Sequence, residues 1–431
     1  MRGGSLEIFL LGIFSATLVA CVATGVPILF ALTFGLLLFS GYVLEVGHSP
    51  RKVVDMWLDG VRPIKTMLLT FLLIGVLTAY WRAAGVIGAI IFYTADFFTP
   101  AIMLLMSFWL CALVSVLTGT AFGTGATMGV ICAATAESFG VPLWLTGGAI
   151  LSGAYFGDRC SPMSTSALLV ATLTRTDIFR NLGNMIRTSI IPFALASLLY
   201  LAAGIFLTGD GAGVNVKEIF ARAFEINFVV LVPAVLIVVL SLLKVRVQLT
   251  MIASILACAI VAVSYQGASL VDLLKVAVIG FVPDDGELAR ILSGGGIVSM
   301  ANVTAIVCLS SCYAGIFKAT GFLNGLQKTF TAAGKRFSPF ASVLTASIVT
   351  AMVACNQTLS IMLTHQLCAK VEPRAEVFAL HLENSAVIVS PLVPWSIACA
   401  VPFTLIGAPV VGVLAAWYLW LLPACSLRSC S

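Results

Sequence analysis

Two acidic residues stand alone in long uncharged sequence, and both have the chemistry to bind a cation or a proton. Asp158 lies between the uncharged stretches 138–157 and 160–174, and Glu383 directly precedes the uncharged stretch 384–427. A lone carboxylate in the middle of a membrane costs about 2.5–3.5 kcal/mol even on the most lenient insertion scale. We therefore interpret Asp158 and Glu383 as functional residues that act as cation ligands or proton carriers.

Arg159 directly follows Asp158 and brings a positive charge next to it. It is either a structural ion-pair partner or a contact for an anionic substrate. Plainer explanations stay open at this point: Gly157–Arg159 could form a loop at the membrane surface, and Glu383 could be a solvated loop acid like Glu372.

Four segments rich in Gly, Ser, Thr, Asn and Pro interrupt the apolar sequence, at 118–127, 152–166, 356–360 and 383–396. Non-helical backbone is tolerated at membrane depth only against protein or a water-filled cavity. The ends of the broken helices then offer N–H groups to anions and carbonyl groups to cations. We predict a binding site in these non-helical segments, although small residues that pack helices closely are the alternative explanation.

The predicted ion or substrate ligands are the two acids and the polar residues of these four segments. They are Asp158, Glu383, Thr118, Gly119, Thr120, Thr124, Ser161, Ser164, Thr165, Asn356, Gln357, Thr358, Asn384, Ser385, Ser390, Trp395 and Ser396.

The composition points to a polytopic α-helical membrane protein. Apolar residues make up 60% of the 431 residues, charged residues only 10%, and the mean hydropathy is +1.11. A soluble domain of this length needs a charged surface that this chain lacks. Uninterrupted apolar runs exclude a β-barrel, which alternates with period two. The net charge of +5 comes without basic runs, so it does not indicate nucleic-acid binding.

An internal repeat divides the chain into two halves, which we place at 1–209 and 210–431. Residues 64–127 resemble 296–363 at an offset near 236. The segments 118–127 and 152–166 fall in the first half, and 356–360 and 383–396 occupy the matching places in the second.

Charges in the corresponding loops indicate that the two halves are inserted in opposite directions. The connector 45–65 is basic and its counterpart 266–290 is mainly acidic, whereas 318–337 is basic and its counterpart 83–99 carries a single acid. The positive-inside rule then turns one half upside down relative to the other. We expect a multi-pass protein of the cell membrane, the inner membrane in a two-membrane cell, with both termini in the cytoplasm.

Two motifs make the chain similar to a known family. Ser152-Gly153-Ala154-Tyr155-Phe156-Gly157-Asp158 with Ser161-Pro162, and Leu382-Glu383-Asn384-Ser385 with Ser390-Pro391-Leu392-Val393-Pro394-Trp395, resemble the NhaC family of Na⁺/H⁺ antiporters, which also contains malate/lactate exchangers. The resemblance covers nearly the whole chain. It implies an all-α inverted-repeat transporter with broken helices and a homodimer, and it makes Asp158 and Glu383 candidate Na⁺ ligands.

The chain departs from that family at two acidic positions. Thr165 stands where the family typically has an acid, and Asn384 and Ser396 replace an acid and an amide of the second motif. Fewer fixed negative charges weaken Na⁺ binding and make an anionic solute more acceptable. Na⁺/H⁺ exchange is therefore the leading expectation, and the alternative is an H⁺- or Na⁺-coupled carrier of a small organic anion or amino acid.

Other classes of function fit the sequence less well. The motif Tyr155-Phe156-Gly157-Asp158 approaches the Gly-x-Gly-Asp of membrane aspartyl proteases, but Tyr155 replaces the first glycine. We expect no enzyme, and a passive channel is a minor alternative. The twelve cysteines lack paired zinc spacing, so we expect no cofactor other than the transported ions.

Overall fold

The structure is a computed structural model of the whole chain, and it is helical throughout the residues that it describes. These are residues 3–24, 26–94, 99–162, 164–207, 221–243, 245–283, 289, 292–322, 338–354 and 356–429. Within these ranges the β-structure is limited to an isolated bridge between Phe281 and Gly294.

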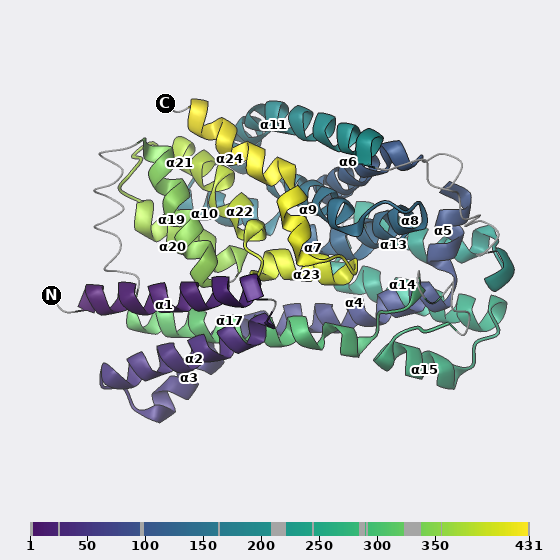
Figure 1. The fold of residues 1–431 in the computed structure, drawn as a ribbon, viewed down its shortest axis with the longest axis horizontal. Helices are drawn as coiled ribbons and strands as arrows, with labels where there is room; N and C mark the ends of the chain where they lie inside the picture. The colour runs from purple at the N-terminus through teal and green to yellow at the C-terminus, as the bar shows by residue number, and fades with distance from the viewer. Residues whose placement is uncertain are drawn as a thin grey trace.

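The helices follow one another closely along the chain (Figure 1). In the first half these are α1 (Gly3–Thr24), α2 (Ile28–Glu45), α3 (Pro50–Val61), η1 (Arg62–Ile64), α4 (Lys65–Ala83), α5 (Val86–Thr94), α6 (Pro100–Thr118), α7 (Ala121–Thr124), the π-helical turn η2 (Gly125–Gly129), α8 (Val130–Ser138), α9 (Leu143–Arg159), α10 (Thr165–Thr174) and α11 (Ile178–Leu207).

The second half has the following elements: η3 (Phe228–Leu231), α13 (Val232–Leu242), α14 (Val247–Tyr265), α15 (Leu270–Ile279), η4 (Ile297–Met300), α17 (Ala301–Thr320), α19 (Pro339–Ala354), α20 (Gln357–Cys368), α21 (Ala375–Asn384), α22 (Ala386–Val389), η5 (Ser390–Leu392), α23 (Ile397–Leu405), η6 (Val410–Ala415) and α24 (Trp417–Ser429).

The outer surface is that of a membrane protein. Large apolar side chains point outward, among them Phe206, Phe228 and Leu270, each more than two-thirds exposed. Among the described residues, five helices are long and apolar enough to cross a membrane: Ile28–Glu45, Pro100–Thr118, Ile178–Phe206, Gln248–Tyr265 and Ile297–Thr320. The predicted fold class, an all-α polytopic membrane protein, is confirmed.

Broken helices are also present, as the sequence predicts. Helices Ala375–Leu392 and Ile397–Leu405 are together long and apolar enough to cross a membrane once, and they meet at a bend of 53°. In the first half, α6 ends at Gly119, which has the left-handed φ of 68°, and α7 and the π-turn η2 follow. Since each break leaves unpaired backbone groups at a helix end, these are the places where an ion can find ligands.

The prediction that both acids lie in non-helical segments is wrong in detail. Asp158 lies in the last turn of α9, and Glu383 is the next-to-last residue of α21. The breaks begin immediately after them, at Cys160 and Ser385. The small residues of 152–159 lie within the continuous helix α9, where Gly153 and Gly157 allow close packing against α6.

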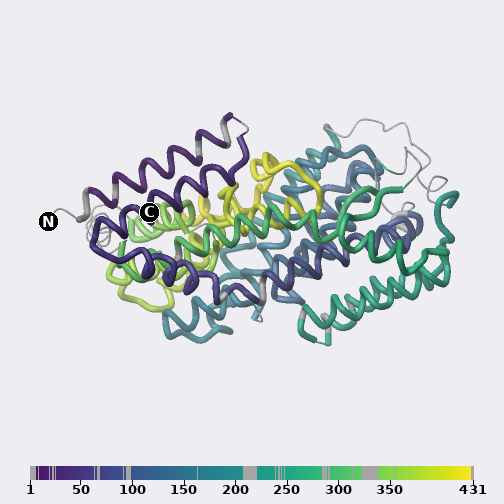
Figure 2. Tube along the Cα trace, turned by 90° about the horizontal axis from the view of Figure 1, so that it is seen from below, coloured from purple at the N-terminus to yellow at the C-terminus, as the bar shows by residue number. Residues whose placement is uncertain are grey.

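Two groups of helices pack reciprocally across the molecule. The helices α2 and α3 pack on α17, while α14 and α15 pack on α4. Figure 1 shows α1 to α3 beside α17 at one end and α14 and α15 beside α4 at the other. Figure 2 shows the same separation from below, with the purple α1 and α2 far from the green α15.

Glycine contacts repeat this reciprocity at single residues. A Cβ on Gly60 would lie 2.0 Å from the carbonyl oxygen of Ser311, and one on Gly75 would lie 2.6 Å from that of Gly296. Gly60 and Gly296 are 236 residues apart, and so are Gly75 and Ser311, so the offset seen in the sequence relates one contact to the other. The boundary between 209 and 210 lies outside the described residues and stays a prediction.

Candidate ion-binding site

Asp158 is held in a buried cage of hydrogen-bond donors. Its side chain is 4% exposed. One carboxylate oxygen accepts from Ser164 Oγ at 3.0 Å, and the other accepts from Ser166 Oγ at 2.9 Å and from Gln357 Nε2 at 3.3 Å. Gln357 comes from the second half of the chain, so the cage joins segments that are about 200 residues apart.

Small residues place Asp158 by letting α9 lie directly against α6. A Cβ on Gly153 would lie 2.3 Å from the carbonyl oxygen of Phe108, and one on Gly157 would lie 2.3 Å from Cβ of Ser115. Ser115 Oγ also donates to the carbonyl of Ala154 at 2.5 Å. The close-packing explanation that the sequence left open therefore holds for these glycines.

The chain then turns sharply and begins a new helix beside the carboxylate. Ser164 caps the start of α10, and its Oγ accepts from the backbone N–H groups of Ser166 and Ala167. Because Ser164 and Ser166 flank this helix start, their hydroxyls face Asp158. Thr165 between them is exposed. Met163 lies outside the described residues.

Glu383 has a very different environment. It is fully buried, and neither of its carboxylate oxygens accepts a hydrogen bond from any described residue. The next residue, Asn384, accepts a hydrogen bond from Arg159, which follows Asp158 in α9, so the three ionisable groups belong to one buried cluster. Burying a carboxylate without hydrogen bonds costs several kcal/mol, so Glu383 lacks a ligand in this arrangement.

The break after Glu383 is tied to the Asp158 cage. Ser385, between α21 and α22, has φ −125° and ψ −83°, and its Oγ donates to the carbonyl of His381 at 2.6 Å. Gln357 Nε2 donates to the carbonyl of Val387 at 3.1 Å as well as to Asp158. The amide of Gln357 thus bridges the two breaks.

Arg159 is completely buried, and its terminal nitrogens are used within the protein. Nη1 donates to the carbonyl of Met185 at 3.0 Å and to Ser189 Oγ at 2.6 Å, both on α11. Nη2 donates to Thr188 Oγ1 at 3.0 Å and to Oδ1 of Asn384. In this conformation both terminal nitrogens are occupied, whereas Nε has no hydrogen-bond partner among the described residues.

Asn384 is therefore a partner of Arg159. Its Nδ2 donates in turn to Ser426 Oγ of α24 at 3.0 Å. The amide thus connects α9, α21 and α24 through two hydrogen bonds, one of which comes from the charged guanidinium. A neutral residue at this position leaves the positive charge of Arg159 uncompensated by its hydrogen-bonding partners.

The remaining predicted residues of the second half lie around these breaks. Asn356 caps α20 by accepting from Leu359 N at 2.8 Å, whereas Thr358 is exposed. Ser390 and Ser396 are buried, with their hydroxyl oxygens 3.5 Å apart. Cys355 lies outside the described residues.

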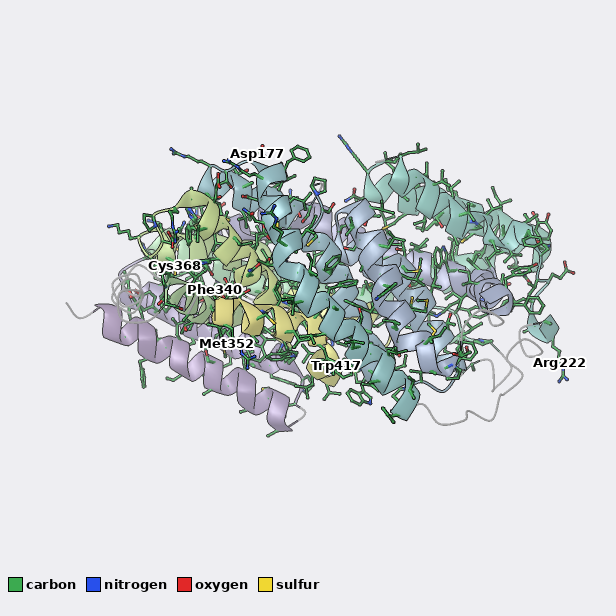
Figure 3. The ribbon with its side chains drawn as sticks, turned by 90° about the horizontal axis from the view of Figure 1, so that it is seen from above. Asp177, Arg222, Phe340, Met352, Cys368 and Trp417 are labelled. Carbon is green, nitrogen blue, oxygen red and sulfur yellow. The ribbon has the colours of Figure 1, made fainter. Side chains whose placement is uncertain are left out.

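Trp395 anchors the bent segment rather than reaching an acid. Its Nε1 donates to the carbonyl of Met352 at 2.9 Å. Figure 3 labels Met352, together with Phe340 and Cys368, beside the yellow C-terminal helices, while Arg222 lies at the opposite end of the molecule. Tyr155 links α9 to the same region by donating to the carbonyl of Ala398 at 2.8 Å.

The threonines of segment 118–127 bond mainly to one another. Thr120 caps α7 by accepting from Gly123 N at 3.3 Å, and Thr124 Oγ1 donates to the carbonyl of Thr120 at 2.9 Å. Oγ1 of Thr118 lies 3.5 Å from that of Thr124. The segment contacts α9 and α23, so it borders the site, although none of the hydrogen bonds among the described residues joins it to either acid.

Comparison with known proteins identifies the family. The model of the Na⁺/H⁺ antiporter family matches residues 5–177 and 153–429. The chain belongs to this family. The family resemblance expected from the two motifs is confirmed, and a transporter family accounts for buried carboxylates at helix breaks better than an enzyme does.

Individual relatives of this antiporter family carry different names. The malate-2H⁺/Na⁺-lactate antiporter of Bacillus subtilis is 29% identical over 90% of this chain and 86% of its own length. The Na⁺/H⁺ antiporter NhaC of the same organism is 26% identical over 88% and 85%. The arginine/ornithine antiporter ArcD of Halobacterium salinarum is 25% identical over 89% and 82%.

Several contributors to the site were missed from the sequence. Ser166 bonds Asp158 where Thr165 was expected, and Thr188 and Ser189 of α11 hold Arg159. Tyr418 Oη of α24 lies 2.9 Å from Ser189 Oγ. The two-residue spacing of Ser164 and Ser166 at a helix start was the signal available for Ser166. The sequence around Thr188, Ser189 and Tyr418 contains no comparable signal.

An apolar cavity of about 460 Å³ lies apart from the acids. It is lined by α4, α5, α6, η2, α8 and α13, and Thr118 and Thr127 mark its border with the segment 118–127. Neither Asp158 nor Glu383 lines it.

Proposed function

We propose that this member of the antiporter family exchanges Na⁺ for H⁺ across the cell membrane, with Asp158 and Glu383 as the central carboxylates. One observation carries the proposal: two buried acids end two helices that Arg159 joins through its hydrogen bond to Asn384, and Glu383 accepts no hydrogen bond from a described residue. Groups placed in this way need a cation or a proton to balance their charge.

The cage around Asp158 suits both cargoes. A proton needs one carboxylate oxygen, whereas a hard metal cation needs several oxygen ligands. The hydroxyls of Ser164 and Ser166 donate to Asp158 in this arrangement, and each also has lone pairs that a cation can use after the hydroxyl rotates. Since Na⁺ and H⁺ compete for the same carboxylate, occupation by one excludes the other, and exchange results.

The helix ends favour a cation as well. Asp158 and Glu383 lie in the last turns of α9 and α21. The carbonyl end of a helix carries partial negative charge, which favours cations. Of the remaining predicted ligands, Gln357, Ser161 and the threonines of 118–127 complete the surroundings of the two breaks.

Arg159 bears on the choice of cargo. A bidentate contact with a substrate carboxylate would need two free guanidinium N–H groups, but the terminal nitrogens of Arg159 donate to α11 and Asn384, and Nε alone has no partner among the described residues. A contact between Arg159 and an anionic substrate is therefore not part of the proposal. Cation exchange follows, although relatives are named for organic solutes.

The architecture supplies a way to alternate access. We propose that the halves 1–209 and 210–431 are inverted repeats, each contributing two site segments, and that both termini face the cytoplasm. The reciprocal packing of α2 and α3 on α17 and of α14 and α15 on α4 supports this arrangement. A pseudo-symmetric pair can exchange inward-open and outward-open shapes. We also propose that the protein forms a homodimer.

The test uses purified protein in liposomes with an imposed pH gradient. Addition of Na⁺ alone should dissipate the gradient. A panel containing malate, lactate and amino acids, each as a salt of a large impermeant cation, should leave it unchanged. Dissipation only after an organic solute is supplied would contradict the proposal and favour the carrier of organic anions or amino acids.

A further inference from the structure

The apolar cavity beside segment 118–127 has a wall with few polar groups, and those groups are used within the protein. Its volume of about 460 Å³ lies in the range of ordinary ligand pockets, roughly 300–1,000 Å³. The hydroxyls of Thr127 and Thr135 each donate to the backbone carbonyl four residues earlier. The indole N–H of Trp81 donates to Ser254 Oγ at 3.0 Å. The described part of the wall therefore favours an apolar occupant.

The cavity opens between α6 and α13 onto the apolar outer surface. Among its lining residues, Leu117 of α6 is 43% exposed, and Val235 and Val239 of α13 are 55% and 45% exposed. One turn earlier on the same helices, Leu113 and Val232 are exposed as well. Because α6 is long and apolar enough to cross a membrane, the surroundings of this opening are hydrocarbon. Lipid chains are the molecules present there.

An acyl chain suits the cavity for two physical reasons. Water would find no free polar partners on the described wall, and apolar cavities of this kind stay dry. Lipid tails are as apolar as the wall, so the gain on entry comes from dispersion contacts that the wall atoms lack across an empty space. A chain is also thin and flexible, so it can pass between two helices while its headgroup stays at the membrane surface.

The inner wall of the cavity, formed by Met128 of η2 and Ile131 of α8, adjoins the candidate ion-binding site. The π-helical turn η2 also contacts α9 and α23. A Cβ on Gly129, the last residue of η2, would lie 3.0 Å from Cγ2 of Ile150 in α9. An occupant of the cavity would therefore touch a turn that packs directly against α9.

We propose that this cavity binds one acyl chain of a membrane phospholipid, which enters between α6 and α13 and packs against η2. The lipid site is separate from the buried acids, and its occupation does not depend on which ion or solute is exchanged. Because the chain fills the space behind η2, it supports the segment that borders the ion-binding site.

The experiment uses the full-length protein in vesicles of phosphatidylethanolamine and phosphatidylglycerol. A small fraction of the phospholipid carries a photoreactive diazirine in the middle of one acyl chain, and mass spectrometry locates the labelled residues after irradiation. Met128 and Ile131 should be labelled, together with Ile190 and Leu198, which are exposed on α11. Label on α11 without label on the inner wall would overturn the proposal.

Filling the cavity with a side chain should displace the lipid chain. Ala234→Phe places a ring in the cavity from the α13 wall, so the label on Met128 and Ile131 should be lost while that on α11 remains. Val114→Phe fills it from the α6 wall, and it replaces the first variant if that protein is not monodisperse on gel filtration. Val263→Phe is the matched control, because Val263 is exposed on α14 outside the cavity, and its labelling should match the wild type.

Inner-wall label that persists in both filled variants would mean that the chain reaches η2 by another route, and it would contradict the proposed site. A second probe, a free fatty acid with the same diazirine, identifies the source of the chain. The ratio of inner-wall to α11 label should be higher for the phospholipid probe. Inner-wall label from the fatty-acid probe alone would contradict a phospholipid occupant.

The labelling experiment requires no transport. Its failure would therefore leave the proposed Na⁺/H⁺ exchange in place, and a lack of Na⁺-driven proton flux would leave the lipid site in place.

Discussion

The surroundings of Asp158 and Glu383 differ more than their matched places in the two halves suggest. Both acids end a helix just before a break, and both are buried. Asp158 receives three side-chain hydrogen bonds, whereas Glu383 receives none from the described residues and faces Arg159. Two acids at similar helix ends can thus differ, one surrounded by hydrogen-bond donors and the other without a donor among the described residues.

The largest effect is expected from removing the charge of Asp158. In Asp158→Asn the shape and burial are kept, but the group that binds Na⁺ or H⁺ is lost. Exchange in proteoliposomes should fall by more than about 100-fold, as expected when the proton-transferring group itself is removed. Insertion, measured by the yield of monodisperse protein in detergent, should be unchanged. Normal exchange by Asp158→Asn would remove the distinction between the two acids.

Removing the charge of Glu383 should lower stability as well as exchange. Glu383→Gln leaves Arg159 buried without its opposing charge, and breaking a buried pair in this way costs about 3–5 kcal/mol. The double variant Arg159→Gln/Glu383→Gln should recover much of that stability because both charges are gone. Thermal unfolding in detergent measures both. If the double variant is less stable than Glu383→Gln alone, the two residues do not compensate each other.

A smaller effect distinguishes two neighbouring hydroxyls. Ser166→Ala removes a hydroxyl that lies 2.9 Å from the Asp158 carboxylate and that we propose as an oxygen ligand for Na⁺. The apparent Na⁺ affinity should fall by about tenfold or more. Thr165→Ala is the matched control, because Thr165 is exposed and should leave the affinity unchanged. The reverse order of effects would mean that α10 presents its other face to the ion.

The smallest effect tests how α9 is positioned. Gly157→Ala places a methyl group 2.3 Å from Cβ of Ser115, so α6 and α9 must move apart at a cost of about 1–3 kcal/mol. Gly183→Ala is the control, because a Cβ there meets no atom within 4 Å. The melting temperature should drop for the first variant only. Equal melting temperatures would show that this helix contact does not hold Asp158 in place.

Much of the site could be predicted from the sequence. Asp158 and Glu383 stand out because a single charge in a long apolar stretch has few structural uses, and Gln357 follows from its place in a polar break. The broken helices follow from clusters of glycine, serine and proline. These signals depend on local sequence, so they can be recognised without knowing how distant segments pack.

Other features could not be predicted, because they depend on packing between distant segments. Segment 152–159 was expected to be non-helical, but Gly153 and Gly157 serve the contact with α6 and leave the helix intact. Which of Thr165 and Ser166 faces Asp158 depends on the rotation of α10. The partners of Arg159 come from α11 and α21, far away in sequence.

The most direct test of the account is the release of protons when Na⁺ binds to purified protein. Na⁺ added to the wild-type protein in weakly buffered detergent solution at neutral pH should release up to one proton per chain. Na⁺ added to Asp158→Asn should release none. Proton release that is the same in both proteins, or absent from a wild-type protein that binds Na⁺, would contradict competition between the two ions at Asp158.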